Sequence, residues 1–259
     1  MNSDFTSVYG PVRSWRYGLS LGIDPIGLLS TCSFDCIYCQ LGAIEVLTQK
    51  RQVFIPTDLI LQELAAVEWQ SLDIVTLSGS GEPTLALNLG EILAGIKTLT
   101  GHPCLVLTNA TLLGDRQVRL DLALADKVTV KLDAVTSDQM RRINRPVPGL
   151  ELSQIVRGIQ TFRQQFGGEL AVQTMVLQPW SEAEKRIYQD LMTQIQPQEI
   201  QLNTPSRPKP QQRQLAGRGN DGGNYATQRL KCVEGEVLLS LAQELGQQTG
   251  IRVRCAPGR

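Results

Sequence analysis

The sequence predicts an α/β fold: a partial (βα)6 barrel of parallel strands, similar in plan to a TIM barrel, with a small C-terminal αβ extension. Short apolar segments alternate along the chain with segments in which apolar residues recur at helical spacing. Strands that are apolar on both faces and alternate with helices indicate parallel βαβ units. The 259 residues are 42% hydrophobic, which is enough for a buried core.

The expected elements follow one another in order. After a short lead-in, strands are expected at residues 17–23, 74–77, 104–108, 128–132, 170–177 and 200–203. Pro56, Thr57 and Asp58 form a helix start, and further helices are expected at 91–99, 115–124, 152–166 and 181–195. The helix over 152–166 has the clearest apolar stripe, from Leu152 to Phe166. Six strand–helix repeats therefore fall within residues 1–204.

The remaining residues predict two further parts. Residues 205–228 are rich in Pro, Gly and Gln and poor in apolar residues, so a flexible linker is expected there. Residues 229–259 contain a helix at about 233–247 and a strand at 251–255. They are too few for a separate domain, and we expect them to cap the open side of the barrel.

Composition excludes several classes of protein. Lys and Arg number 25 and so do Asp and Glu, so no overall positive field attracts nucleic acid. No apolar run has the length of a membrane span, and the first residues lack the layout of a secretory signal. Six cysteines, three of them clustered, fit a reducing compartment. We therefore expect a cytoplasmic protein with no membrane partner.

Cys32, Cys36 and Cys39 are the most informative residues, because they form a C-x3-C-x2-C triplet in a short loop. Three such thiolates can hold three irons of a 4Fe–4S cluster. Iron–sulfur clusters usually have four cysteine ligands, so a triplet without an obvious fourth partner leaves one iron open to a small molecule.

Other interpretations of the triplet are weaker. A structural zinc site takes four Cys or His ligands, and the only histidine, His102, lies in a Gly-His-Pro turn without ligand spacing. A disulfide framework suits small secreted chains. A non-catalytic iron–sulfur carrier remains an alternative, although a carrier needs no open iron.

Polar residues lie at the expected strand ends, where parallel barrels place their active sites. The second strand is followed by Ser-Gly-Ser-Gly-Glu-Pro-Thr at 78–84. Its glycines let the backbone approach a ligand, and Glu82 is a carboxylate suited to the ammonium group of an amino acid. Asn109 and Asp133 follow the third and fourth strands, and Gln173 lies in the fifth.

These motifs resemble those of radical S-adenosylmethionine (radical SAM) enzymes, in which Tyr38 would be the aromatic residue before the last cluster cysteine. An ordered set of motifs is similar to the radical SAM group related to the tRNA wyosine-synthesis (4-demethylwyosine synthase-like) proteins; they lie at residues 9–26, 32–42, 77–84, 130–134, 143–146 and 201–205. The wyosine synthases carry a second cluster on cysteines before this loop, and no cysteine precedes Cys32 here.

The resemblance implies one 4Fe–4S cluster on Cys32, Cys36 and Cys39, with S-adenosylmethionine (SAM) on the open iron. It implies that SAM is cleaved reductively to a 5′-deoxyadenosyl radical, which takes hydrogen from an unidentified substrate. An electron donor such as a flavodoxin or ferredoxin is expected. The implied SAM contacts are Tyr38 against the adenine, Gly81 and Glu82 at the amine, and Asn109, Asp133 and Gln173 at the ribose or carboxylate.

A tRNA-modifying, wyosine-type activity is the alternative within enzymes. Arg141, Arg142 and Arg145 lie near the expected mouth of the barrel and are candidates for phosphate contacts. The basic residues between 207 and 231 are more simply solvated charge. Cys104 is expected in the core, and Cys232 and Cys255 flank the last helix without enough ligands for a second cluster. The sequence predicts neither the substrate nor the oligomeric state.

Overall fold

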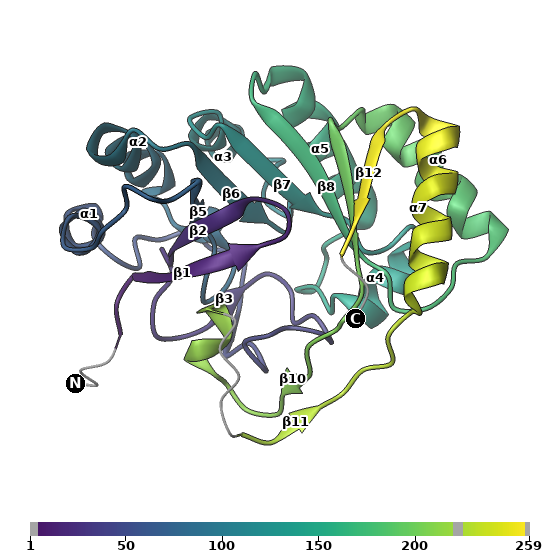
Figure 1. The fold of residues 1–259 in the computed structure, drawn as a ribbon, viewed down its shortest axis with the longest axis horizontal. Helices are drawn as coiled ribbons and strands as arrows, with labels where there is room; N and C mark the ends of the chain where they lie inside the picture. The colour runs from purple at the N-terminus through teal and green to yellow at the C-terminus, as the bar shows by residue number, and fades with distance from the viewer. Residues whose placement is uncertain (1–4, 220–224, 257–259) are drawn as a thin grey trace.

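An eight-stranded sheet forms the centre of the computed structural model, which describes residues 5–219 and 225–256. Its strands lie in the order β1 (Val8–Ser14), β2 (Gly18–Ile23), β5 (Ile74–Leu77), β6 (Cys104–Thr108), β7 (Lys127–Lys131), β8 (Glu169–Met175), β9 (Glu199–Asn203) and β12 (Arg252–Cys255). Every neighbouring pair from β2 to β12 is parallel. The predicted partial barrel is confirmed (Figure 1).

Helices connect the parallel strands and lie along the outer side of the sheet, with α1 and α2 beside β5 and β6, and α6 and α7 beyond β8 and β12 (Figure 1). Their bounds are α1 (Thr57–Ala65), α2 (Leu89–Thr100), α3 (Arg116–Leu122), α4 (Ser137–Ile143), α5 (Leu152–Gln165), α6 (Glu182–Ile195) and α7 (Gly235–Thr249). Capping boxes begin α5 at Glu151 and α6 at Ser181, which satisfies backbone N–H groups that a first turn leaves unpaired. Among the described helices, none is long and apolar enough to cross a membrane.

The two faces of the sheet differ in chemistry. In β7, Val128 and Val130 are buried in the apolar core beneath the helices, and Thr129 alternates with them. Tyr17 bonds Thr129 across the interior at 2.5 Å and accepts from Gln201 at 2.7 Å. The interior of the barrel therefore contains a polar layer and is not filled by apolar side chains alone.

Two elements differ from the expectation. Residues 8–14, expected as lead-in, form β1, which pairs antiparallel with β2. Gly10 and Pro11 interrupt the strand pattern there, and the register shifts between Tyr9 and Val12. Helix α4 was not expected, because Met140 is the only buried residue among the seven that it contains and it has no apolar stripe.

The last part of the chain joins the main sheet. Strand β12 pairs parallel with β9, so the C-terminal extension continues the sheet. Within the predicted linker, the described residues include β10 (Lys209–Pro210), β11 (Thr227–Gln228) and the 3-10 helix η2 (Leu215–Gly219). Residues 220–224 and 257–259 lie outside the described residues. The division of the chain at 204 and 228 stays a prediction.

Candidate functional site

Three cysteine thiols lie together beyond the carboxyl ends of the first parallel strands. Cys32 is in β3 (Thr31–Cys32), which pairs with β4 (Val46–Leu47), and Cys36 and Cys39 follow in a turn closed by a 3.1 Å backbone hydrogen bond. Burial raises the pKa of all three thiols, that of Cys36 to about 12. The nearby carboxylate of Glu82 raises the pKa of Cys32 further. A metal bound by these thiols would take the place of their protons.

The donor set fits an iron–sulfur cluster. Among the described residues, no three His, Cys, Asp or Glu side chains are arranged to surround a single metal ion. Iron–sulfur clusters are larger than a single ion and are held by cysteine thiolates, which is the donor set that this loop offers. The residues would hold such a cluster as three ligands from one loop.

Two asparagine amides approach the cysteine sulfurs. Asn109, after β6, donates to Cys32 Sγ at 3.5 Å and to Ser33 Oγ at 2.9 Å. Asn144, after α4, donates to Cys36 Sγ at 3.4 Å. Asn109 was predicted as a site residue; Asn144 was not singled out, and its only signal in the sequence is its position inside the 143–146 motif.

Glu82 is a buried carboxylate, 2% exposed, held by neutral donors. Its Oε1 accepts from the Thr84 N–H and hydroxyl at 3.1 and 2.6 Å and from the Thr108 hydroxyl at 2.6 Å. Its Oε2 accepts from the Asn109 N–H at 2.7 Å. Burial raises the pKa of Glu82, and these hydrogen bonds oppose the rise. Because a carboxylate oxygen has two lone pairs, Oε2 retains room for a further donor.

The glycine-rich loop is joined directly to the cysteine loop. Gly81 forms an isolated parallel bridge with Thr31, and Glu82 N donates to Thr31 O at 3.0 Å. A Cβ on Gly81 would lie 1.7 Å from that oxygen, so only glycine fits. Cys32 follows Thr31 and Glu82 follows Gly81, so the parallel bridge places Glu82 beside Cys32.

Asp133 lies at the end of β7 and organises the opposite wall. It accepts hydrogen bonds from Tyr38 Oη, from Asn144 at 2.8 Å and from the Met175 N–H at 2.8 Å, and it forms an ion pair with Lys131 at 3.1 Å. The Lys131 ammonium lies 4.9 Å from the centre of the Tyr38 ring. The four partners occupy both carboxylate oxygens of Asp133.

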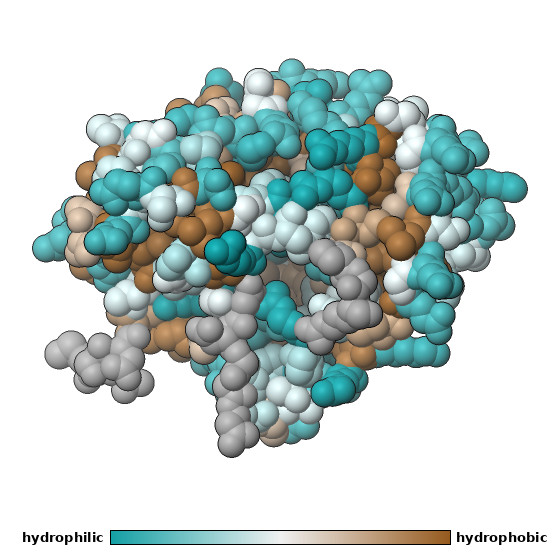
Figure 2. Space-filling view, viewed as in Figure 1, coloured by the Kyte–Doolittle hydropathy of each residue, from teal (hydrophilic) through white to brown (hydrophobic). Residues whose placement is uncertain are grey.

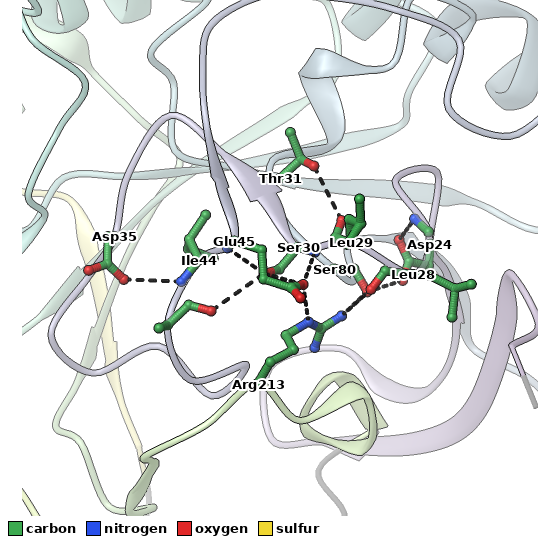
Figure 3. Close-up of polar contacts among 12 residues, drawn as sticks. Asp24, Leu28, Leu29, Ser30, Thr31, Asp35, Ile44, Glu45, Ser80 and Arg213 are labelled. Atoms are coloured by element: carbon green, nitrogen blue, oxygen red, sulfur yellow. Dashed lines mark hydrogen bonds and ion pairs between the residues drawn. The ribbon is translucent and has the colours of Figure 1, made fainter. Parts of the chain in front are cut away.

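The segment predicted as a linker crosses the cysteine loop. Arg213 forms an ion pair with Glu45 at 3.3 Å and donates to Ser80 Oγ at 2.9 Å. Glu45 in turn accepts from Ser30 N at 2.8 Å, so Arg213 connects the cysteine loop and the glycine-rich loop (Figure 3). Lys209 donates to Cys36 O at 3.2 Å. Composition alone indicated solvated charge here and gave no sign of these contacts.

The remaining candidates lie further out. Gln173 is buried in β8, in register with Lys131. Arg142 is exposed on α4 and pairs with Asp138 at 2.8 Å. Cys104 is buried in β6 as expected, and Cys232 is exposed.

Comparison with known proteins decides the family. Residues 27–191 match the radical SAM superfamily. The chain belongs to this superfamily. It also belongs to the UPF0026 proteins, since it is 61% identical over 261 residues to one from Synechocystis sp., covering 99% of this chain and 98% of the relative. A UPF0026 protein from Methanocaldococcus jannaschii is 34% identical over 209 residues, covering 78% of this chain and 64% of the relative.

Solved radical SAM structures share the fold. Streptococcus suis SuiB, in a crystal structure with its precursor peptide SuiA, has a TM-score of 0.63 at 14% sequence identity. The match covers 91% of this chain and 48% of the SuiB chain. Radical SAM membership implies that SAM and an iron–sulfur cluster are used. These comparisons do not bear on the narrower likeness to wyosine-synthesis proteins.

Proposed function

We propose that this protein is a radical SAM enzyme that holds one 4Fe–4S cluster on Cys32, Cys36 and Cys39 and binds SAM at the iron without a cysteine ligand. When bound, such a cluster would supply one electron to the S–C5′ bond of SAM, which would give methionine and a 5′-deoxyadenosyl radical able to take a hydrogen atom from the substrate. An electron donor such as a flavodoxin or ferredoxin would reduce the cluster. The substrate is unidentified.

The observation that carries the proposal is the position of Glu82. A buried carboxylate with four neutral donors lies beside the cysteine loop and has an acceptor site free on Oε2. An ammonium group that bound there would favour the ionised carboxylate, which burial otherwise disfavours. The methionyl amine of SAM is such a group, and a protein that only carried a cluster would have no use for this arrangement.

We propose a different role for each of the other predicted SAM contacts. Asn109 supports the amine site through its backbone N–H, and its side chain is engaged with the cysteine loop. The contacts of Asp133 favour an indirect role, in which it fixes the Tyr38 ring that would lie against the adenine. Gln173 remains a candidate from its burial in β8.

The test is anaerobic reconstitution followed by reduction. Wild-type protein should bind about four irons per chain and, once reduced, convert SAM to methionine and 5′-deoxyadenosine. Replacing all three cysteines with Ala should abolish both. A reduced wild-type protein with a full cluster that forms no 5′-deoxyadenosine would support the iron–sulfur carrier in place of the enzyme.

A tRNA-modifying, wyosine-type activity is the second candidate. It is favoured by the exposed guanidinium groups of Arg141 and Arg142 on α4 and of Arg145 just after it, with side chains 61%, 70% and 56% exposed. Arg145 also pairs with Asp35 in the cysteine loop at 3.5 Å. A tRNA bound at this edge would lie close to the cluster loop.

A further inference from the structure

A cavity of about 470 Å³ lies inside the barrel, separate from the contacts described for SAM. The β1–β2 hairpin forms one wall, the inner sides of β5 and β6 form another, and the residues after β9 form the rim. The face drawn in Figure 2 is hollowed near its centre, between the hairpin and the segment that carries β10. The volume lies within the range of small-molecule sites, about 300–1,000 Å³.

The charged side chains among the described lining residues are all arginines. Four arginines line it, and none of the described lining residues is an Asp or Glu; the arginines are Arg13, Arg16, Arg207 and Arg218. Arg218 is neutralised by Asp24 at 2.8 Å, an ion pair that is almost fully buried. Arg13, Arg16 and Arg207 add three further guanidinium groups to the lining.

Arg16 is the key member of this set. Its Nε is buried and has no hydrogen-bond partner among the described residues. Burial lowers the pKa of Arg16; the positive charges of Arg207 and Arg254 lower it further, and Tyr17 and Glu199 oppose this. A buried guanidinium with a donor left unpaired is costly, and an anion in the cavity would remove that cost.

The cavity extends to the end of β5, where the loop that leads to Glu82 begins. Ser78, the first residue after β5, lines it and begins the loop that leads to Glu82. Tyr9 bonds Ser78 Oγ at 2.6 Å, and its ring packs over Gly22. A molecule in the cavity would therefore lie beneath the strand ends at which the radical would form.

We propose that this cavity is the substrate site and that it takes a small molecule carrying a phosphate or carboxylate group, which Arg16 binds together with Arg207. The inference rests on the proposed function, since it names the substrate class of the same enzyme. Trp15, Tyr9 and Tyr17 supply apolar contact for the rest of the molecule. A guanidinium that meets an oxyanion forms two parallel hydrogen bonds, which orient as well as bind.

Trp15 provides the test, because it lines the cavity and its ring lies 5.2 Å from the Arg16 guanidinium. Trp69 and Trp180 are first changed to Phe in the full chain, which leaves Trp15 as the only tryptophan. The reconstituted protein is titrated with inorganic phosphate and, separately, with succinate. A saturable fluorescence change with phosphate identifies a phosphate ester as the substrate class, and one with succinate identifies a carboxylate.

Arg16→Gln should weaken binding of the responding probe roughly ten- to a hundredfold, as loss of a charged hydrogen-bond donor does. Arg207→Gln should weaken binding of the same probe as well. Arg207 lies outside the β1–β2 hairpin, so this variant tests the site even if Arg16→Gln disturbs the hairpin. Arg157→Gln, at an exposed position on α5, is the matched control and should leave binding unchanged.

Three results would overturn the inference: no saturable response to either probe, a response that neither cavity substitution alters, or a response to bulk tRNA alone. The titration needs no SAM cleavage. Absence of 5′-deoxyadenosine therefore contradicts the proposed enzyme without contradicting anion binding, and absence of anion binding leaves SAM cleavage standing.

Discussion

At the scale of single residues, the most consequential contacts are the amide hydrogen bonds to cysteine sulfur. Asn109 and Asn144 each direct an Nδ2 donor at a different cysteine, and both are also held by a second partner. Hydrogen bonds to the sulfurs of a cluster stabilise its more negative, reduced form and so raise its reduction potential. These two residues therefore set how readily the cluster would accept an electron.

Asn144→Leu should lower the reduction potential of the reconstituted cluster, on the order of tens of millivolts, because Cys36 loses its donor. The measurement is a redox titration followed by electron paramagnetic resonance. Asn88→Leu is the control, since Asn88 is also buried but donates to Ile55 O at 3.0 Å. Equal shifts in both variants would mean that the effect is structural.

Glu82→Gln should leave the iron content unchanged and weaken SAM binding by about 1.5–3 kcal/mol, roughly ten- to a hundredfold. The amide removes the negative charge that the ammonium group needs, and its NH₂ faces the donors of Thr84, Thr108 or Asn109. Equilibrium dialysis with labelled SAM at constant cluster content measures the change. Unaltered affinity would place the amine of SAM elsewhere.

The site residues that the sequence predicts are those within short local motifs. Cys32, Cys36, Cys39 and Glu82 have a spacing that points to their chemistry before any fold is known. Asn144 and Arg213 have no such pattern, because their partners lie 108 and 133 residues away along the chain. Such contacts depend on tertiary structure, and a single sequence does not contain a local signal for them.

At the scale of elements, the segment from β10 to η2 acts as a brace over the cysteine loop. Gln214 N donates to Leu41 O at 2.9 Å, and a Cβ on Gly217 would lie 2.1 Å from Gln40 O. Arg213 adds the link between Glu45 and Ser80. The brace therefore limits the opening of the loop that would hold the cluster.

Arg213→Gln should speed hydrogen exchange in the cysteine loop and hasten cluster loss to a chelator. The expected loss of local stability is about 1 kcal/mol or less, because the Glu45 side chain is 38% exposed and solvent screens the pair. Arg163→Gln is the control, since Arg163 donates to Gln196 O at 2.8 Å on the outer side of the molecule. If hydrogen exchange in the cysteine loop is equally slow in the wild type, in Arg213→Gln and in Arg163→Gln, the segment from β10 to η2 does not act as a brace.

Elements with strong periodicity or clear end signals were predicted well. Helix α5 matches its apolar stripe, and α6 begins after Ser181 with a capping box. Strand β1 and helix α4 were missed because neither has a regular apolar pattern: β1 contains a register shift, and α4 buries only Met140. Both are stabilised by tertiary contacts more than by local preference.

At the scale of the whole molecule, a balanced total charge conceals an uneven distribution. Lys and Arg equal Asp and Glu at 25 each, yet four arginines and no described acidic residue line the cavity. On the α4 edge, Arg142 pairs with Asp138 and Arg145 with Asp35, which reduces the local positive charge. Arginines thus gather at the cavity, and Arg142 and Arg145 at the outer edge have acidic partners.

This distribution predicts weak binding of bulk tRNA. We expect a log–log salt slope of about 1–2, which corresponds to one or two phosphate contacts. Changing Arg141, Arg142 and Arg145 together to Gln should leave the slope nearly unchanged. Filter binding at two salt concentrations measures it, and a steep slope that these substitutions reduce would instead favour the wyosine-type alternative.

Strand β12 holds the turn between β1 and β2 at the cavity wall, so this contact forms only after β12 has been synthesised. The Arg254 guanidinium donates to Trp15 O at 2.6 Å and to Arg16 O at 3.2 Å, across 239 and 238 residues of sequence. At a translation rate of about 5–20 residues per second, roughly 12–48 s separate the synthesis of the two partners. During that interval the cysteine loop has already been made, but the hairpin lacks the strand that holds it. A cluster inserted during that interval would therefore enter a chain in which Arg254 does not yet hold the hairpin.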